Sequence, residues 1–399
     1  MLRNCESPAR LKKALQSLPK TLYETYDRIL LNIDEEHRRD ALRMLQWLAF
    51  SLVTISLEQG VEVLATDPDA DDGLLFDPGR RPWDPRQIVH ICSSLVTTFK
   101  SDIDPYTRTT PTRLRLAHFS VREYLISDYL RQCDDTLSFF HFDPKIADTT
   151  IAKTCLAYLL QFTQHGCINS STKTSYPLSE YAAQYWMYHA WSDNGDSDDL
   201  HRLIMDLLQD KDAMYTNWLT LREPFHWVSR HDFAPLYYTS MGGLRKATEC
   251  LLESSKVNAC RGLYGHELQV ASSGGHDNIV RLLLEKGADV NMETGYYGSA
   301  LQAASLNGDD SIIRLLLEKG AEVNMQGGRY GNALQAASLR GHESIVRLLL
   351  EKGADVNMQG GEDGSALQAA SSHGHNSIFH LLLEKGADIN MRGGTSVKR

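Results

Sequence analysis

The sequence predicts a mostly α-helical chain, in which a helical N-terminal half with one β-hairpin precedes a helical solenoid. A pattern of 33 residues recurs in the last part of the chain, which is typical of stacked structural repeats. Upstream, apolar residues recur at helical spacing on both sides of two short β-rich runs. At 399 residues the chain is long for one core, so several domains are expected.

The composition excludes several functional classes. Hydrophobic residues make up 42% of the chain and charged residues 23%, as in an ordinary folded protein. A net charge of -10 gives no general attraction for phosphate backbones or anionic membranes, so neither nucleic acid nor a membrane is expected as a partner. Seven scattered cysteines without a Cys-x-x-Cys pair, and no signal peptide or long apolar segment, predict a cytoplasmic protein.

The first half begins with two helices. LPKTLYETYDRILLNI has apolar residues at helical spacing, and Asp34 opens a second helix in EEHRRDALRMLQWLAFS. Two capping boxes are predicted, one from Ser56 to Gln59 and one from Ser120 to Glu123. In each, the hydroxyl accepts from the amide three residues on, and the side chain of that later residue accepts from the amide of the serine.

A β-hairpin follows the helix PRQIVHICSS, with strands in LVTTF and RLRLAHF. Three helices and a hairpin predict a winged-helix domain over residues 34–131. Residues 1–131 hold 18 Lys plus Arg against 19 Asp plus Glu, so this domain lacks the basic excess that DNA binding needs. Residues 132–231 are predicted to form a helical linker domain.

The segments LQSLPKTLYETYDRIL, MLQWLAFS, ICSSLV and LRLAHFSVREYLISD resemble the region that follows the ATPase core in fungal NACHT-type (STAND, NLR-like) signalling proteins. KTCLAYLLQF and YPLSEYAAQYWMYHAW are similar to the helical region that joins the winged helix to repeats in those proteins. The resemblance implies that residues 1–33 are a helical remnant of the region after the ATPase. The chain has no Gly-x-x-x-x-Gly-Lys loop to hold phosphates, so no catalysis and no cofactor are expected.

His118 is the one candidate cofactor-binding residue. It lies at the end of the second wing strand, where the resemblance implies a histidine that senses a bound nucleotide if an ATPase core is supplied. The alternative is a structural histidine, which is the commoner role for a single His. A Ser-His hydrolase site at Ser120 is disfavoured because no Gly-x-Ser-x-Gly elbow is present.

The repeats are visible as near-identical copies of one segment. GSALQAASLNG at Gly298 recurs at Gly331 and Gly364, with a related copy at Gly265 and a degenerate one from Pro235. In each clear copy a small polar residue, such as Ser299, can cap a thin first helix, and a Leu-rich second helix ends on glycine. Five repeats are predicted, at residues 232–264, 265–297, 298–330, 331–363 and 364–396.

This segment resembles the ankyrin family, with Ala-Leu-Gln-Ala-Ala in place of the commoner Thr-Pro-Leu-His-x-Ala. The resemblance implies that a protein ligand binds the concave surface formed by hairpin tips and first helices. Positions that differ between copies are the candidate contacts, because near-identical positions are framework. They are Tyr296, Tyr297, Asn307, Arg329, Tyr330, Arg340, Glu362, Asp363 and His373.

The varying positions and the repeated histidines each allow a second interpretation. Tip residues also vary because solvated loops drift freely in sequence, which is an alternative for each position taken singly. His373 and His375 suggest a metal site, but His276 and His342 occupy the same repeat slot as His375, which makes these histidines framework residues and predicts no metal.

The sequence therefore predicts a non-enzymatic protein-interaction module, the ligand-sensing and regulatory part of an NLR-like signalling protein. The alternative is the regulatory half of an ATP-driven STAND NTPase, whose ATPase core lies upstream of a truncated gene model or in another chain. Both hypotheses place ligand recognition on the repeats.

Overall fold

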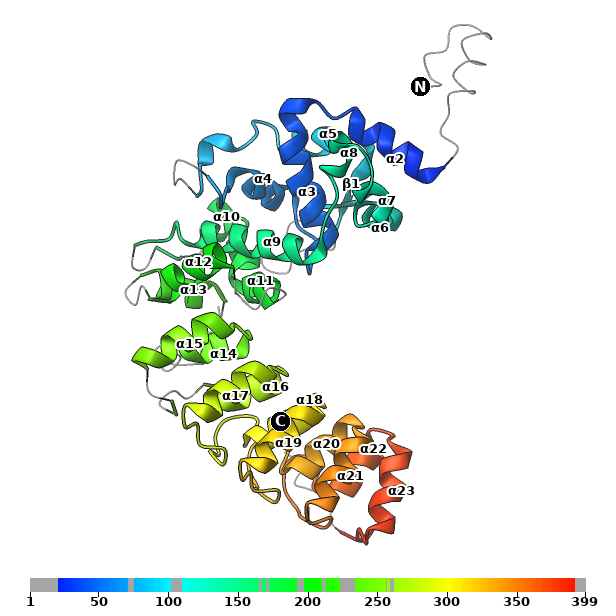
Figure 1. Cartoon of the computed structure of the whole chain (residues 1–399), viewed down its shortest axis with the longest axis vertical. Helices are drawn as coiled ribbons and strands as arrows, with labels where there is room; N and C mark the ends of the chain where they lie inside the picture. Colours follow the sequence, from blue (N-terminus) through cyan, green and yellow to red (C-terminus); the bar gives the residue numbers. More distant parts are fainter. Residues whose placement is uncertain are drawn as a thin grey trace, which may run out of the picture. The chain divides into compact units, whose positions relative to one another are not determined.

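The computed structural model describes residues 21–70, 75–101, 110–164, 167–169, 172–191, 197–209, 213–222, 234–255, 257–258 and 262–391. The chain is mostly helical and divides into two compact units, Met1–His189 and Ala190–Arg399 (Figure 1). Within the described ranges, every helix is too short or too polar to cross a membrane.

The first unit begins with helices and one hairpin. β1 (Val96–Lys100) and β2 (Thr112–Leu116) pair antiparallel, with Val96 opposite Leu116. The segment before α4 joins this hairpin, because the Leu114 amide donates to the Ile55 carbonyl at 2.9 Å. The elements before the hairpin are α2 (Leu22–Leu31), η2 (Glu35–His37), α3 (Arg38–Phe50), α4 (Leu57–Ala65), η3 (Pro78–Arg80), α5 (Gln87–Ile91) and η4 (Ser93–Leu95).

Further helices complete the first unit after the hairpin. They are α6 (Phe119–Leu125), α7 (Asp128–Arg131), α8 (Asp135–Ser138), α9 (Pro144–Leu159), α10 (Thr172–Ser175) and α11 (Ser179–Trp191). The α3 face that carries Trp47 packs against α11, where the Trp47 and Tyr181 rings lie 5.2 Å apart. Buried Glu62 of α4 accepts from Tyr158 of α9 at 2.8 Å and pairs with Arg81 at 2.9 Å. A buried carboxylate needs such partners because desolvation is costly.

One of the two predicted capping boxes is confirmed and the other is wrong. Ser56 and Gln59 cap α4 reciprocally, at 3.2 and 2.8 Å. At the second site α6 begins one residue before Ser120, and its cap is the His118 ring, which accepts from the Ser120 amide at 3.3 Å. The Ser120 hydroxyl instead bonds Tyr26 of α2, because it is buried under that helix.

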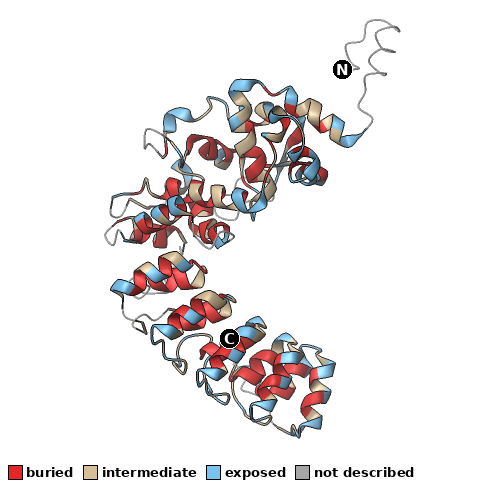
Figure 2. Cartoon of the chain, in the orientation of Figure 1, coloured by how far each residue is buried: buried red, intermediate tan, exposed pale blue. Residues whose placement is uncertain are grey.

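The second unit is a row of helix pairs, with buried residues along the helix surfaces that face each other (Figure 2). Each pair consists of a short first helix and a second helix with a Leu-rich buried face. The five pairs are α14 (Pro235–Met241) with α15 (Arg245–Ser254), α16 (Glu267–Ser273) with α17 (Asp277–Glu285), α18 (Ala300–Asn307) with α19 (Asp310–Glu318), α20 (Ala333–Arg340) with α21 (Glu343–Glu351), and α22 (Ala366–Ser372) with α23 (Asn376–Glu384).

Helices α12 (Asp198–Gln209) and α13 (Met214–Arg222) belong to the second unit and precede its first pair. Trp218 of α13 packs edge-on against Tyr238 of α14, with ring centroids 4.8 Å apart. Residues 132–231, predicted as one helical linker domain, contain α8 to α11, which lie in the first unit except for the last two residues of α11, and α12 and α13, which lie in the second. Through Trp218, α13 covers apolar surface on α14 that would otherwise face solvent.

The local sequence explains the shape of each pair. Ser299 caps α18 by accepting from the Gln302 amide at 3.2 Å, and Asn332 does the same for α20 at 2.9 Å, as predicted. Gly308 and Gly341 then end these helices at φ 91° and 78°, a region that side chains with a Cβ avoid. The predicted helix-turn-helix pattern is confirmed here.

Candidate protein-binding site

Buried glutamines hold each hairpin against the first helix of the preceding repeat. The Gln302 side-chain oxygen accepts from the Ser299 amide, while its nitrogen donates to the Gly331 carbonyl at 2.8 Å, 29 residues further on. Gln269 and Gln335 make the same bond to the carbonyls of Gly298 and Gly364. The glutamine that replaces the commoner histidine therefore fixes the position of the following hairpin.

Asparagine side chains form a second set of hydrogen bonds between consecutive repeats, to the backbone that follows the second helix. Asn291 donates to the Gly320 carbonyl at 3.0 Å and accepts from the Glu322 amide at 2.9 Å. Asn324 and Asn357 repeat this pattern one repeat later each time. Together with the glutamines, these bonds hold the hairpins at a regular spacing.

The hairpin tips are joined through the backbone. The Tyr296 amide donates to Leu263, the Arg329 amide to Tyr296 and the Glu362 amide to Arg329, each bond 2.9 to 3.0 Å long. These four positions are 33 residues apart and form one continuous row. Their side chains are therefore presented by a connected backbone and not by independent loops.

Aromatic rings cover this row, and we call the set Leu263, Tyr264, Tyr296, Tyr297, Arg329, Tyr330 and Glu362 the tip surface. Tyr296 lies at its centre. Its ring contacts Tyr264 at 5.8 Å, Tyr297 at 5.7 Å and Tyr330 at 5.5 Å between centroids, mostly edge to face. Such geometry stabilises aromatic clusters beyond simple burial.

Arg329 links the aromatic part of the tip surface to its acidic end. Its guanidinium donates to Glu362 at 2.7 Å and to the Tyr296 hydroxyl at 2.6 Å, and it lies 5.3 Å from the centre of the Tyr296 ring. The bond to Glu362, then that to Tyr296, raises the pKa of Arg329. Burial and the bond to the Tyr296 hydroxyl raise the pKa of Tyr330, so this phenol stays protonated.

The structure brings only part of the predicted set together. Tyr296, Tyr297, Arg329, Tyr330 and Glu362 lie in the tip surface, and half-buried Asp363 follows Glu362. The other three, each exposed, lie at the C-terminal ends of first helices, and within the described part of the chain no hydrogen bond or ring contact joins them to the tip tyrosines. They are Asn307, Arg340 and His373.

Sequence comparison between copies missed two residues of the tip surface. Leu263 and Tyr264 are 55% and 39% exposed and extend the aromatic cluster by one repeat. They precede Gly265 as Tyr296 and Tyr297 precede Gly298, so the repeat pattern itself identifies them as tip positions. The Gly265 copy differs from the three near-identical copies, so a comparison of those three does not reach these two residues.

The repeated histidines bond backbone carbonyls of the preceding pair. His276 lies 2.9 Å from the Met241 carbonyl and His375 lies 3.0 Å from that of Leu339. Where the third copy has Asp309, that carboxylate caps α19 instead. Among the described residues, no group of three His, Cys, Asp or Glu side chains is arranged to hold a metal ion.

His118 lies on the surface of the first unit. Its Nδ1 accepts from the Ser120 amide and lies 2.6 Å from the Ser120 hydroxyl, which in turn lies 2.8 Å from the Tyr26 hydroxyl. The imidazole also lies 4.2 Å from the exposed Phe119 ring. Nδ1 is thus occupied in capping α6, and only Nε2 is left to meet a ligand.

Comparison with known proteins gives two family-model matches and one relative. A family model described as "Ankyrin repeats (3 copies)" matches residues 300–393, and a model described as "Ankyrin repeat" matches residues 267–295. The chain is also 34% identical over 296 residues to the "Azaphilone pigments biosynthesis cluster protein L" of Monascus ruber, an alignment covering 69% of this chain and 61% of that protein. The C-terminal part of this chain is therefore built of ankyrin repeats, and such repeats imply a protein-interaction module.

Proposed function

We propose that the chain is a non-enzymatic, cytoplasmic recognition protein whose tip surface, with the ends of α18, α20 and α22, forms the concave site for a protein ligand. The observation that carries this proposal is the tip surface itself. Tyrosines and an arginine are the residues most often found at interface hot spots. Here they are exposed or half-buried on a backbone row that is already ordered, so binding loses little conformational entropy.

The tip surface favours a protein over nucleic acid. Its one arginine is neutralised by Glu362 at 2.7 Å, which leaves no excess positive charge to meet phosphates. Aromatic rings and a leucine dominate the remainder, and such a composition suits an apolar anchor with a polar rim. We therefore assign a polypeptide partner to this surface and neither DNA nor RNA.

We propose that the first unit is a winged-helix domain. We propose also that it relays regulation in an NLR-like signalling protein. The support is the succession of α3, α4 and α5 before the β1–β2 hairpin, with Ile55 hydrogen-bonded to the second strand. The resemblance of residues 1–131 to the region that follows a NACHT ATPase points the same way. Because the sequence holds no phosphate-binding loop, purified protein is expected neither to hydrolyse nor to bind ATP tightly.

The experiment is affinity capture with the full-length chain, followed by identification of the bound proteins. A variant with Tyr296, Tyr297, Arg329 and Tyr330 replaced by alanine should lose its specific partner. The matched control replaces Lys286, Lys319 and Lys385, exposed residues that end second helices, and should retain it. Equal capture of the same partner by both variants would show that the tip surface is not the site.

A further inference from the structure

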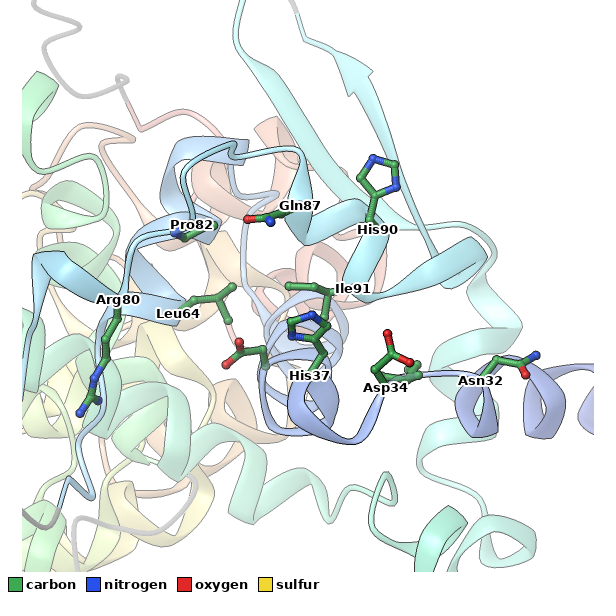
Figure 3. A pocket seen from close by; sticks show the side chains of 11 residues that line it. Asn32, Asp34, His37, Leu64, Arg80, Pro82, Gln87, His90 and Ile91 are labelled. Atoms are coloured by element: carbon green, nitrogen blue, oxygen red, sulfur yellow. The ribbon is translucent and has the colours of Figure 1, made fainter.

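The first unit contains an open cavity of about 520 Å³ that none of the features above uses (Figure 3). Its walls come from five places in the chain: the end of α2, the start of α3, α4, the η3 segment and α5. A volume of this size falls within the ~300–1,000 Å³ of small-molecule sites. Its lining is Asn32, Ile33, Asp34, His37, Asp40, Leu64, Arg80, Pro82, Gln87, His90 and Ile91.

The cavity has an apolar base and a carboxylate without a partner. Ile33 and Leu64 are 4% and 6% exposed and form apolar wall. Within the part of the chain that the structure describes, the Asp40 carboxylate has no hydrogen bond or ion pair, and burial raises its pKa. A desolvated acid of this kind gains free energy when a cation reaches it.

Arg43 and Arg80, two arginines of this region, are bonded to other groups. Arg43 donates to the Thr66 carbonyl at 3.0 Å and to Asp67 at 2.5 Å. The Arg80 guanidinium is turned away from the middle of the cavity in Figure 3 and lies 3.4 Å from Asp67 and 3.8 Å from Asp77. Neither arginine is hydrogen-bonded to Asp40, although burial, which raises the pKa of Asp40, is partly offset by the charges of Arg43, His37 and Arg39.

The polar lining also holds a second acid, two amides and the imidazoles of His37 and His90. Asp34 lies in the loop after α2, and the amides of Asn32 and Gln87 belong to the lining, with His37 drawn between Asp34 and Leu64 in Figure 3. The amides supply carbonyl oxygens, and the two aspartates supply negative charge. Together these groups offer several acceptors to one donor-rich cation.

We propose that this cavity binds an alkylguanidinium group, with Asp40 as its half-buried counter-charge, Asp34 as a second acceptor and the apolar wall against the alkyl stem. A guanidinium fits better than an ammonium because its planar set of five donors can meet acceptors on several walls at once. It is also more weakly hydrated, so less solvation is lost on entry. The group belongs either to a free small molecule or to an arginine side chain of a polypeptide.

The test is ligand-observed saturation-transfer NMR with the full-length protein and three probes of similar size, butylguanidinium, butylammonium and butylurea. Butylguanidinium should bind most tightly, and the neutral urea at least tenfold more weakly. Asp40→Asn should weaken butylguanidinium binding at least tenfold, whereas Asp128→Asn, an exposed aspartate on α7, should leave it unchanged. Circular dichroism and the thermal midpoint show that each variant is folded.

A fourth probe, the peptide acetyl-Gly-Arg-Gly-amide, identifies the source of the group. Binding of the peptide within threefold of butylguanidinium supports the site and assigns it to a polypeptide arginine. Binding of butylguanidinium alone supports the site and assigns it to a small molecule. Equal binding of butylurea, or affinity unchanged by Asp40→Asn in a folded variant, would overturn the proposal.

Discussion

The side-chain amide of Gln302 donates to the backbone carbonyl of Gly331 at 2.8 Å, and both groups are buried between consecutive repeats. This bond joins the first helix of one repeat to the hairpin that begins the next. The Gln302 oxygen meanwhile accepts from the Ser299 amide, so one side chain satisfies backbone groups on both sides of the interface. Buried backbone groups left without such a partner are costly.

Replacing Gln302 by alanine should loosen the following hairpin. The change removes the acceptor of the buried Ser299 amide, which costs about 1–3 kcal/mol, and leaves the Gly331 carbonyl with the Gly327 amide alone. Hydrogen exchange of the amides in residues 325–331 should speed up accordingly. Gln326, which donates to the Gln359 carbonyl at 2.9 Å but is exposed, is the control, and its alanine variant should exchange like the parent protein. Similar acceleration in both variants would contradict the role given to Gln302.

Leu349 should be one of the strongest determinants of stability in the repeats. Its side chain is fully buried on α21, and Leu349→Ala should cost about 2–5 kcal/mol through lost burial and the cavity left behind. Urea unfolding of the full-length chain measures the loss. The neighbouring Leu350 is half-buried, so Leu350→Ala should cost less. Equal losses at the two positions would mean that α21 does not present the face described here.

His276 should make the repeat stack less stable in acid. Burial lowers its pKa, although its bond to the Met241 carbonyl acts in the opposite direction. The unfolded chain therefore binds the proton more readily, and stability falls as the pH drops through about 6.5, the pKa of a free histidine. Above that pH no penalty applies.

Urea unfolding at pH 7.5 and pH 5.5 checks this expectation for His276. The loss between the two values should be smaller in His276→Gln, which keeps a donor but does not titrate. His380→Gln, at an exposed position on α23, should lose as much as the parent protein. If His276→Gln lost as much stability between the two pH values as the parent protein, the acid sensitivity would not come from His276.

Periodicity was sufficient to predict the repeats, because each helix and cap depends on residues a few positions apart. Ser299 and Asn332 cap their helices and Gly308 ends α18, as the local sequence predicts. The cluster around Tyr296 depends on contacts between residues 33 apart, so sequence could suggest its members but not that Arg329 would bond both Tyr296 and Glu362.

Prediction failed where a tertiary contact competed with a local one. Ser120 has the sequence of a helix cap, but the packing of α2 gives its hydroxyl to Tyr26, and His118 takes over the cap. The cavity around Asp40 was also missed, because its lining comes from segments up to about sixty positions apart with no shared motif. Such sites follow from packing and leave no periodic signal.

The glutamine and asparagine links all reach one repeat forward, over 29 to 31 residues, and no further. A gain or loss of 33 codons within this region would therefore restore every link at the new junction. Whole-repeat duplication or deletion could lengthen or shorten the stack in a single genetic event while the protein still folds. The row of tips would then change its length, and with it the set of partners, without any change to the framework.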